Sequence, residues 1–260
     1  MYIIAEGDLP ICLCAHMDTV FPIPPKDIYF DSEQSIMWSP QGLGADDRAG
    51  IYCIINLLEM GFKPSIILTD LEEYGGKGAD ALVAKYPTCP FQKCKALIQL
   101  DRQGENDSVF YECDNVEFEN KINSYGFKTD FGSFTDISII APTWEIAAVN
   151  LSVGYKNEHQ YIETLNLKQC HATINKVSKM LKDCNNWGYY VYIPLVYLNP
   201  FLPYISSETN NNQEPWWISQ TCKYCGKQLE VDEGYLIESK NKNPYEEFLI
   251  CDECYKKYAK

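Results

Sequence analysis

Residues 10–18 read PICLCAHMD, an unbroken apolar run that ends in His16, Met17 and Asp18. A run of this kind is typical of a strand that is buried on both faces of a sheet. Similar runs follow at 65–68, 95–100 and 146–152. Apolar residues recur at helical spacing at 47–60, 76–86, 134–140 and 167–184. Strands that alternate with helices predict an α/β domain, with a mostly parallel central sheet that helices cover on both faces.

The α/β pattern occupies only part of the chain. It includes a stretch at 111–127 where we expect antiparallel strands, which would make the sheet mixed. In 186–220, aromatic residues and prolines lead into a polar stretch that is typical of a linker. Residues 221–260 are rich in cysteine and lysine. The sequence therefore predicts a main domain at 1–185, a connecting segment at 186–220 and a small module at 221–260.

The amino-acid composition and net charge exclude several classes of protein. Of 260 residues, 46% are apolar and 22% charged, which suits a packed core and excludes disordered and fibrous proteins. The formal net charge of −14 argues against a nucleic-acid binder, because phosphate contacts need clustered basic residues. We find neither an apolar run long enough to span a membrane nor a signal peptide at 1–10. We therefore expect a cytoplasmic protein whose twelve cysteines are thiols or metal ligands.

Two polar motifs each have an ordinary explanation when taken singly. His16 and Asp18 follow the first strand; a carboxylate beside a histidine can fix its tautomer, but the two could equally be a surface pair. In GLGADDRAG (42–50), Asp46 and Asp47 open a predicted helix. They could cap that helix or bind metal, since one carboxylate can bridge two cations.

Three further features also follow predicted strands. Glu72 and Glu73, in LTDLEEYGG (68–76), could lie in a solvated loop. Alternatively, one of them could bind a metal while the other acts as a general base. Asp101 ends the strand KALIQL, and His159 follows the last predicted strand. An acid at a strand tip and a lone loop histidine are each unremarkable.

Considered together, these residues indicate a metal site. Five of them fall at or after strand ends, where parallel strands bring side chains to one edge of a sheet: His16, Asp46, Glu73, Asp101 and His159. The first four are separated by 30, 27 and 28 residues, each about the length of one strand–helix unit. Two histidines and three carboxylates suit a pair of zinc ions roughly 3.5–4 Å apart with one bridging carboxylate.

At this point the sequence resembles the co-catalytic zinc exopeptidases, which include secreted-type bacterial leucyl aminopeptidases, peptidase T, glutamyl aminopeptidases and aminoacylases. The resemblance covers about 10–185 and rests on motifs in the family's order: AHMDTV, GLGADDRAG, LTDLEEYGGKGA, LIQLDRQG and GYKNEHQYIETLNL. It implies the zinc-exopeptidase fold and an active site with two zinc, cobalt or manganese ions. The lid domain that some members carry before the final histidine is missing here.

The resemblance also implies a role for each residue. Asp46 would bridge the two metals and be joined to Asp47 by a cis peptide bond. His16 and Asp101 would complete one site, whereas Glu73 and His159 would complete the other. Glu72 would be the general base and Asp18 the residue that orients His16. The donor to the oxyanion is left open, with Tyr125 and Arg102 as candidates.

The C-terminal module has its own metal-binding pattern. Cys222 and Cys225 form one Cys-x2-Cys pair, and Cys251 and Cys254 form a second. Four thiolates at this spacing predict a closed structural zinc site in a zinc-ribbon-like module. So short a segment lacks a large core, and we expect zinc to drive its folding. The module could bind a protein partner, bind nucleic acid or only stabilise the chain.

The leading interpretation is a zinc-dependent metallopeptidase, an aminopeptidase or small-peptide hydrolase that acts on a peptide or small amide. Two alternatives stay open: an amidase or deacylase that acts on a non-peptide amide, and a non-catalytic adaptor that docks through the zinc module. An acyl-transfer or cyclising enzyme with one zinc ion fits less well, because both metal sites are complete. The sequence also leaves open whether the chain forms oligomers.

Overall fold

The computed structural model describes residues 1–194 and four strand segments at 220–221, 228–229, 235–238 and 247–250. The chain divides into two compact units, Met1–Leu195 and Val196–Lys260. Every helix found among the described residues belongs to the first unit. None of these helices has the length and apolar character needed to cross a membrane.

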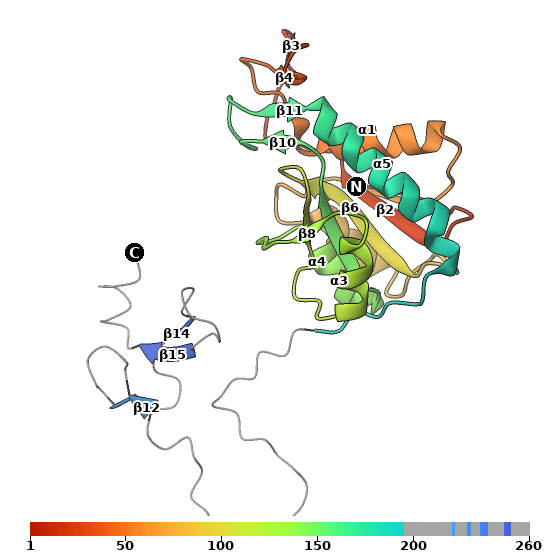
Figure 1. Cartoon of the computed structure of the whole chain (residues 1–260), viewed down its shortest axis with the longest axis vertical. Coiled ribbons are helices and arrows are strands. Elements are labelled where there is room, and N and C mark those ends of the chain that lie inside the picture. Colours follow the sequence, from red (N-terminus) through yellow and green to blue (C-terminus); the bar gives the residue numbers. More distant parts are fainter. Residues whose placement is uncertain (195–219, 222–227, 230–234, 239–246, 251–260) are drawn as a thin grey trace, which may run out of the picture. The chain divides into compact units, whose positions relative to one another are not determined.

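A seven-stranded mixed sheet forms the centre of the first unit, in the order β1-β5-β2-β6-β9-β7-β8 (Figure 1). The strands are β1 (Tyr2–Ala5), β2 (Ile11–His16), β5 (Ser65–Thr69), β6 (Ala96–Arg102), β7 (Asp107–Val109), β8 (Lys128–Thr129) and β9 (Ala148–Ser152). Strands β5, β2, β6 and β9 run parallel, whereas β1 is antiparallel to β5 and β7 is antiparallel to β9. The segments that follow the parallel strands therefore meet at one edge of the sheet.

Helices cover both faces of this sheet (Figure 1). They are α1 (Ala45–Glu59), α2 (Lys77–Lys85), α3 (Val116–Asn123), α4 (Ile137–Trp144) and α5 (Leu167–Asp183), followed by a 3-10 turn at Cys184–Asn186. Strand β2 contacts both layers. Ile11 and Leu13 pack in one apolar cluster with α1 and α5, while Cys12 and Cys14 pack in another with α2 and α4. This explains the unbroken apolar run, and it confirms the predicted α/β fold.

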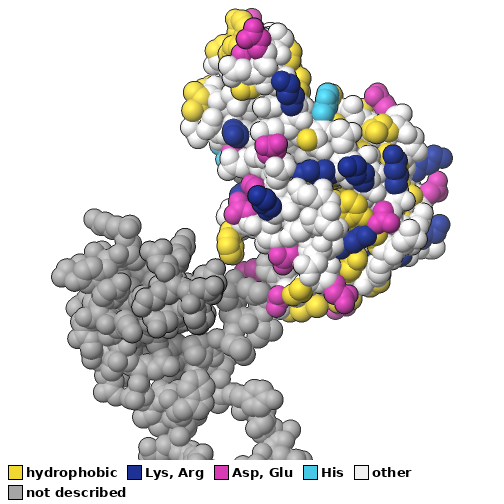
Figure 2. All heavy atoms as spheres, viewed as in Figure 1, with side chains coloured by type: hydrophobic (Ala, Val, Ile, Leu, Met, Phe, Trp, Pro, Cys, Tyr) yellow, Lys and Arg dark blue, Asp and Glu magenta, His cyan; other side chains and the backbone are white. Residues whose placement is uncertain are grey.

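A second, four-stranded antiparallel sheet was not predicted. Its order is β10-β11-β4-β3, formed by β3 (Tyr29–Asp31), β4 (Ile36–Trp38), β10 (Tyr155–Lys156) and β11 (Thr164–Asn166). Figure 2 shows apolar side chains exposed at this end of the unit, and Tyr29 and Phe30 are each 50% exposed. The sheet matters for function because the segment between β10 and β11 carries His159.

The prediction of antiparallel strands at 111–127 is wrong, because the central part of this stretch, Val116–Asn123, forms α3. Val116 and Phe118 alternate with acidic residues, a pattern that a strand could also show. The side chain of Asn115 accepts a hydrogen bond from the backbone N–H of Phe118 at 3.0 Å and so caps the helix. Phe118 and Ile122, one turn apart, are both fully buried.

The first unit continues past the end of α5. Trp187 is buried, and the backbone N–H of Ala147 donates to the carbonyl of Tyr190 at 2.9 Å. In the second unit, β12 (Gln220–Thr221) pairs with β13 (Gln228–Leu229), and β14 (Tyr235–Glu238) pairs with β15 (Glu247–Ile250). The four cysteines of the predicted zinc module, Cys222, Cys225, Cys251 and Cys254, lie outside the described residues.

Candidate metal centre

The five candidate ligands come from five different segments that meet at the edge where the parallel strands end. His16 is the last residue of β2, and Asp101 lies near the end of the adjacent strand β6. Glu73 follows β5, Asp46 lies at the start of α1, and His159 lies between β10 and β11. The structure therefore brings together residues that are up to 143 positions apart, from 16 to 159.

Asp46 lies between the two histidines. Its Oδ1 atom is 3.0 Å from His16 Nε2, and its Oδ2 atom is 3.2 Å from His159 Nε2. On one side, His16 Nε2 is also 3.4 Å from Asp101 Oδ1; on the other, His159 Nε2 is 2.9 Å from Glu73 Oε2. The centre thus has two halves, His16 with Asp101 and His159 with Glu73, and each half faces a different oxygen of Asp46.

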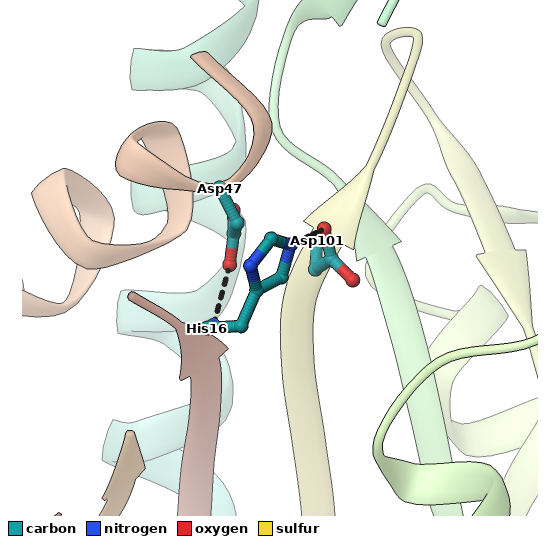
Figure 3. A group of neighbouring side chains, drawn as sticks. All are labelled: His16, Asp47 and Asp101. Carbon is teal, nitrogen blue, oxygen red and sulfur yellow. Dashed lines mark hydrogen bonds and ion pairs between the residues drawn. The ribbon is translucent and has the colours of Figure 1, made fainter. Parts of the chain in front are cut away.

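Asp47 has a structural role beside these residues. The Asp46–Asp47 peptide bond is cis, as the resemblance implied, and neither residue has helical backbone angles. Asp47 Oδ1 accepts a hydrogen bond from the backbone N–H of Gly50 at 2.9 Å, which caps the helical part of α1. Its Oδ2 accepts from the backbone N–H of His16 at 3.2 Å, the contact drawn in Figure 3. The two aspartates therefore differ in role: Asp47 caps the helix, whereas Asp46 is among the candidate metal ligands.

Asp18 connects His16 to the two glutamates. Its Oδ1 lies 3.3 Å from His16 Nδ1, an approach that lacks hydrogen-bond alignment. The same carboxylate accepts hydrogen bonds from the backbone N–H groups of Glu72 at 3.1 Å and Glu73 at 3.2 Å. Asp18 thus holds the peptide that carries both glutamates, a role that sequence reasoning did not foresee.

Burial and neighbouring groups shift the pKa values of several residues of the centre. Burial, followed by the charge of Asp101, raises the pKa of Glu72 to about 8. Burial, followed by the charge of Asp46, raises the pKa of Glu73 to about 7. The hydrogen bond to Asp46 raises the pKa of His159 to about 9, although burial opposes this. Such shifts are typical of functional sites, where like charges are held together.

These observations fit bound cations. His16, Asp46 and Glu73 offer ligand atoms within 4.8 Å of one another, as do His16, Asp47 and Asp101, the group drawn in Figure 3. Glu73 Oε1 and His16 Nδ1 are buried without a hydrogen-bond partner among the described residues. Imidazole nitrogens and carboxylate oxygens are also ligands that zinc binds in proteins.

Other residues support the ligands. Glu163 is fully buried, and its two oxygens accept hydrogen bonds from the backbone N–H groups of Ala45 at 3.0 Å and Asp46 at 3.2 Å. Asp101 accepts from the hydroxyl of Thr135 at 2.8 Å and from that of Tyr155 at 3.2 Å. Sequence reasoning missed all three; Glu163 alone left a signal, as an acid four residues after His159.

An open pocket of about 130 Å³ borders the centre. Its lining includes Asp46, Glu72, Asp101 and His159, so the proposed base and three candidate ligands face the same space. Further lining residues are Arg102, Gln103, Tyr111, Ser133, Phe134, Tyr155 and Glu158. Of the two expected oxyanion donors, Arg102 is therefore at the pocket. Tyr125 is not part of the lining; its hydroxyl donates to Asp183.

Comparisons with known proteins identify the fold. No protein family matches this sequence, and no curated protein does. Among solved structures, aminopeptidase PepT from Bacillus cereus has a TM-score of 0.55 at 15% identity, over 71% of this chain and 84% of that one. A tripeptidase from Staphylococcus aureus has a TM-score of 0.57 at 15% identity, over 72% and 84%. At this identity the similarity shows that the fold is shared.

Proposed function

We propose that the chain is a zinc-dependent metallopeptidase, an aminopeptidase or small-peptide hydrolase. The position of Asp46 is the main support, since one carboxylate presents its two oxygens to two histidines. The two solved structures of the same fold are an aminopeptidase and a tripeptidase, which favours peptides over other amides. The fold alone does not carry function, so the proposal rests on the site.

His16 and Asp101 would hold one zinc ion, Glu73 and His159 the second, and Asp46 both. When bound, the ions supply Lewis-acid chemistry: they polarise the amide carbonyl and lower the pKa of water. Glu72 then accepts a proton from the attacking water and passes it to the leaving amine. Its position supports this role, because it lines the pocket while Asp18 holds its backbone.

The pKa of Glu72 also suits proton transfer. A general base works best when its pKa lies near the working pH, and burial raises that of Glu72 to about 8. Bound cations would lower this value by offsetting the charge of Asp101. Replacing Glu72 by Gln removes the proton acceptor with little change in shape. We expect kcat to fall by about 10²–10⁴-fold with zinc content unchanged; unchanged hydrolysis would show that Glu72 is not the base.

We also propose that Cys222, Cys225, Cys251 and Cys254 bind a structural zinc ion. The spacing of the two Cys-x2-Cys pairs supports this. Elemental analysis of the purified full-length chain tests both sites together. We expect about three zinc equivalents per chain, one after His16 and His159 are both replaced by Ala, and two after Cys222 and Cys225 are both replaced by Ser. A full-length chain with one equivalent, unchanged by the histidine substitutions, would favour the adaptor alternative.

A further inference from the structure

We propose that Tyr111 donates a hydrogen bond to the substrate carbonyl oxygen as negative charge develops on it. This assignment rests on the proposed amide hydrolysis and identifies a donor that the sequence left open. Tyr111 follows β7 and lines the same pocket as Glu72 and Asp101. The hydrogen bonds of Asn150 determine where the hydroxyl hydrogen of Tyr111 is directed.

Asn150 is held in one orientation by the backbone of Asp101. Its Oδ1 accepts a hydrogen bond from the Asp101 N–H at 2.9 Å, and its Nδ2 donates to the Asp101 carbonyl at 2.7 Å. A flipped amide would place donor against donor and acceptor against acceptor, and Asn150 is only 1% exposed. The Nδ2 group is therefore fixed on the side that faces Tyr111.

The second hydrogen of Asn150 Nδ2 is directed to Tyr111. The two atoms are 3.1 Å apart, so the phenol oxygen is the acceptor. The hydroxyl hydrogen of Tyr111 must then point elsewhere, and it has no acceptor among the described residues. Burial raises the pKa of Tyr111 to about 12, which keeps this hydrogen in place at neutral pH. Tyr111 thus presents an unused donor at the pocket.

The position of Tyr111 is fixed on its other side as well. A Cβ atom at Gly132 would lie 3.1 Å from the Tyr111 hydroxyl oxygen, which is closer than an ordinary contact, so a side chain at 132 would require a small shift of Tyr111. Tyr111 itself has a left-handed backbone, with φ of 43°. An unfavourable backbone that is maintained by its surroundings is common at functional sites. A fixed donor stabilises developing charge better than a mobile one, because it needs no reorganisation.

Three other polar groups of the pocket fit this role less well. The Tyr155 hydroxyl already donates to Asp101 at 3.2 Å. Two acids hold the Arg102 guanidinium: its Nη2 donates to Asp130 at 3.1 Å, and its Nε lies 3.9 Å from Asp107 Oδ2. Ser133 is exposed.

In the proposed attack on the amide, the water oxygen bonds to the carbonyl carbon, the C=O π electrons move to oxygen, and the water proton goes to Glu72. Tyr111 keeps its own proton throughout.

The test compares Tyr111→Phe with Tyr125→Phe in the zinc-loaded full-length chain. Tyr125→Phe is a matched control that removes a hydroxyl away from the pocket. For an aminoacyl-peptide substrate we expect Tyr111→Phe to lower kcat by about 10²-fold, with KM changed by less than about threefold. Affinity for a phosphinic dipeptide, which has tetrahedral oxygens at the reacting centre, should fall by a similar factor in calorimetry. Zinc content should not change.

Each outcome decides the assignment. If the wild-type chain hydrolyses peptides and Tyr111→Phe matches it in kcat and phosphinate affinity, Tyr111 is not the donor and the proposed function stands. A loss that appears in Ser133→Ala instead would transfer the role to Ser133. If the zinc-loaded wild type neither hydrolyses peptides nor binds the phosphinate, the proposed function fails, and the role of Tyr111 fails with it.

Discussion

The two histidines of the candidate centre have unlike surroundings. The His16 side chain is 1% exposed at the end of a core strand, where it contacts Asp18, Asp46 and Asp101. The His159 side chain is 51% exposed, and its residue has a left-handed backbone with φ of 64°. One half of the centre therefore belongs to the core, whereas the other is carried by a connection between two short strands. Changes to the two halves should have different consequences.

Loss of the shared carboxylate should have the largest effect, because it affects both halves. We expect Asp46→Asn to lose both active-site zinc ions and to lower kcat/KM by on the order of 10³-fold or more. Lewis-acid stabilisation contributes several kcal/mol, and each 1.4 kcal/mol corresponds to tenfold in rate. Elemental analysis and peptide-hydrolysis assays check this. Asp8→Asn, an exposed acid that contacts Lys63, is the control. Retention of either active-site ion would show that Asp46 does not bridge them.

The comparison of His16→Ala with His159→Ala tests the difference between the halves directly. In the zinc-free chain, His16→Ala removes a buried partner from three carboxylates, and we expect a loss of unfolding free energy of about 3 kcal/mol. His159 is half exposed, so solvent screens its ion pairs and we expect a loss below about 1 kcal/mol. Urea denaturation of both variants measures this. Equal losses would contradict the view that only one half belongs to the core.

The pH dependence of the zinc-free chain provides a smaller effect. Hydrogen bonding to Asp46 raises the pKa of His159 to about 9, so its stabilising contribution is complete below about 6.5 and is lost as the pH rises through 9. Burial raises the pKa of Glu73 to about 7, so its protonated form also favours the folded state at low pH. Its contribution is lost between about 4.5 and 7. We therefore expect Tm to fall as the pH rises from about 5 to 9.

A matched variant separates the contribution of His159 from those of the buried glutamates. His159→Gln should reduce the decrease between about 6.5 and 9 and leave the parts due to Glu72 and Glu73, whose pKa values burial raises to about 8 and about 7. Bound zinc should flatten the profile, because metal binding replaces the protons on its ligands. A Tm that rises with pH in the zinc-free wild type would contradict the assigned pKa shifts.

The sequence predicted those parts of the molecule that depend on local pattern. Strand β2 was recognisable because both of its faces are buried, which leaves an unbroken apolar run. The candidate ligands were recognisable because each lies at or just after a strand end, where the fold brings them together. The stretch 111–127 was misjudged because alternation of apolar and acidic residues at 116–119 is compatible with either a strand or a helix.

Contacts between distant segments could not be predicted in this way. Asn150 and Tyr111 are 39 positions apart, and Asp18 is 54 positions from the peptide that it holds. Neither pair has a local motif, because each depends on how the sheet places two segments that are far apart in the sequence. The small second sheet was not predicted for the same reason, because its strands β4 (36–38) and β11 (164–166) are far apart in the sequence.

Two supporting residues, Glu163 and Thr135, contact different ligands of the centre. Both oxygens of Glu163 accept backbone N–H groups, one of them from Asp46, so this residue acts on the shared ligand. The Thr135 hydroxyl donates to Asp101 and so acts on the His16 half. Glutamine at 163 would place an NH₂ group against one of the two N–H donors, and we expect a loss of about 1–2 kcal/mol in unfolding free energy.

Zinc titration against a competing chelator distinguishes the two supporting residues. We expect Glu163→Gln to weaken both active-site ions by roughly 10-fold, because both depend on the position of Asp46. We expect Thr135→Val to weaken only one binding step, because Val keeps the shape of Thr but cannot hold the Asp101 carboxylate. If Glu163→Gln affected a single step, Asp46 would belong to one half only. The two halves would then bind their ions independently, without a shared carboxylate.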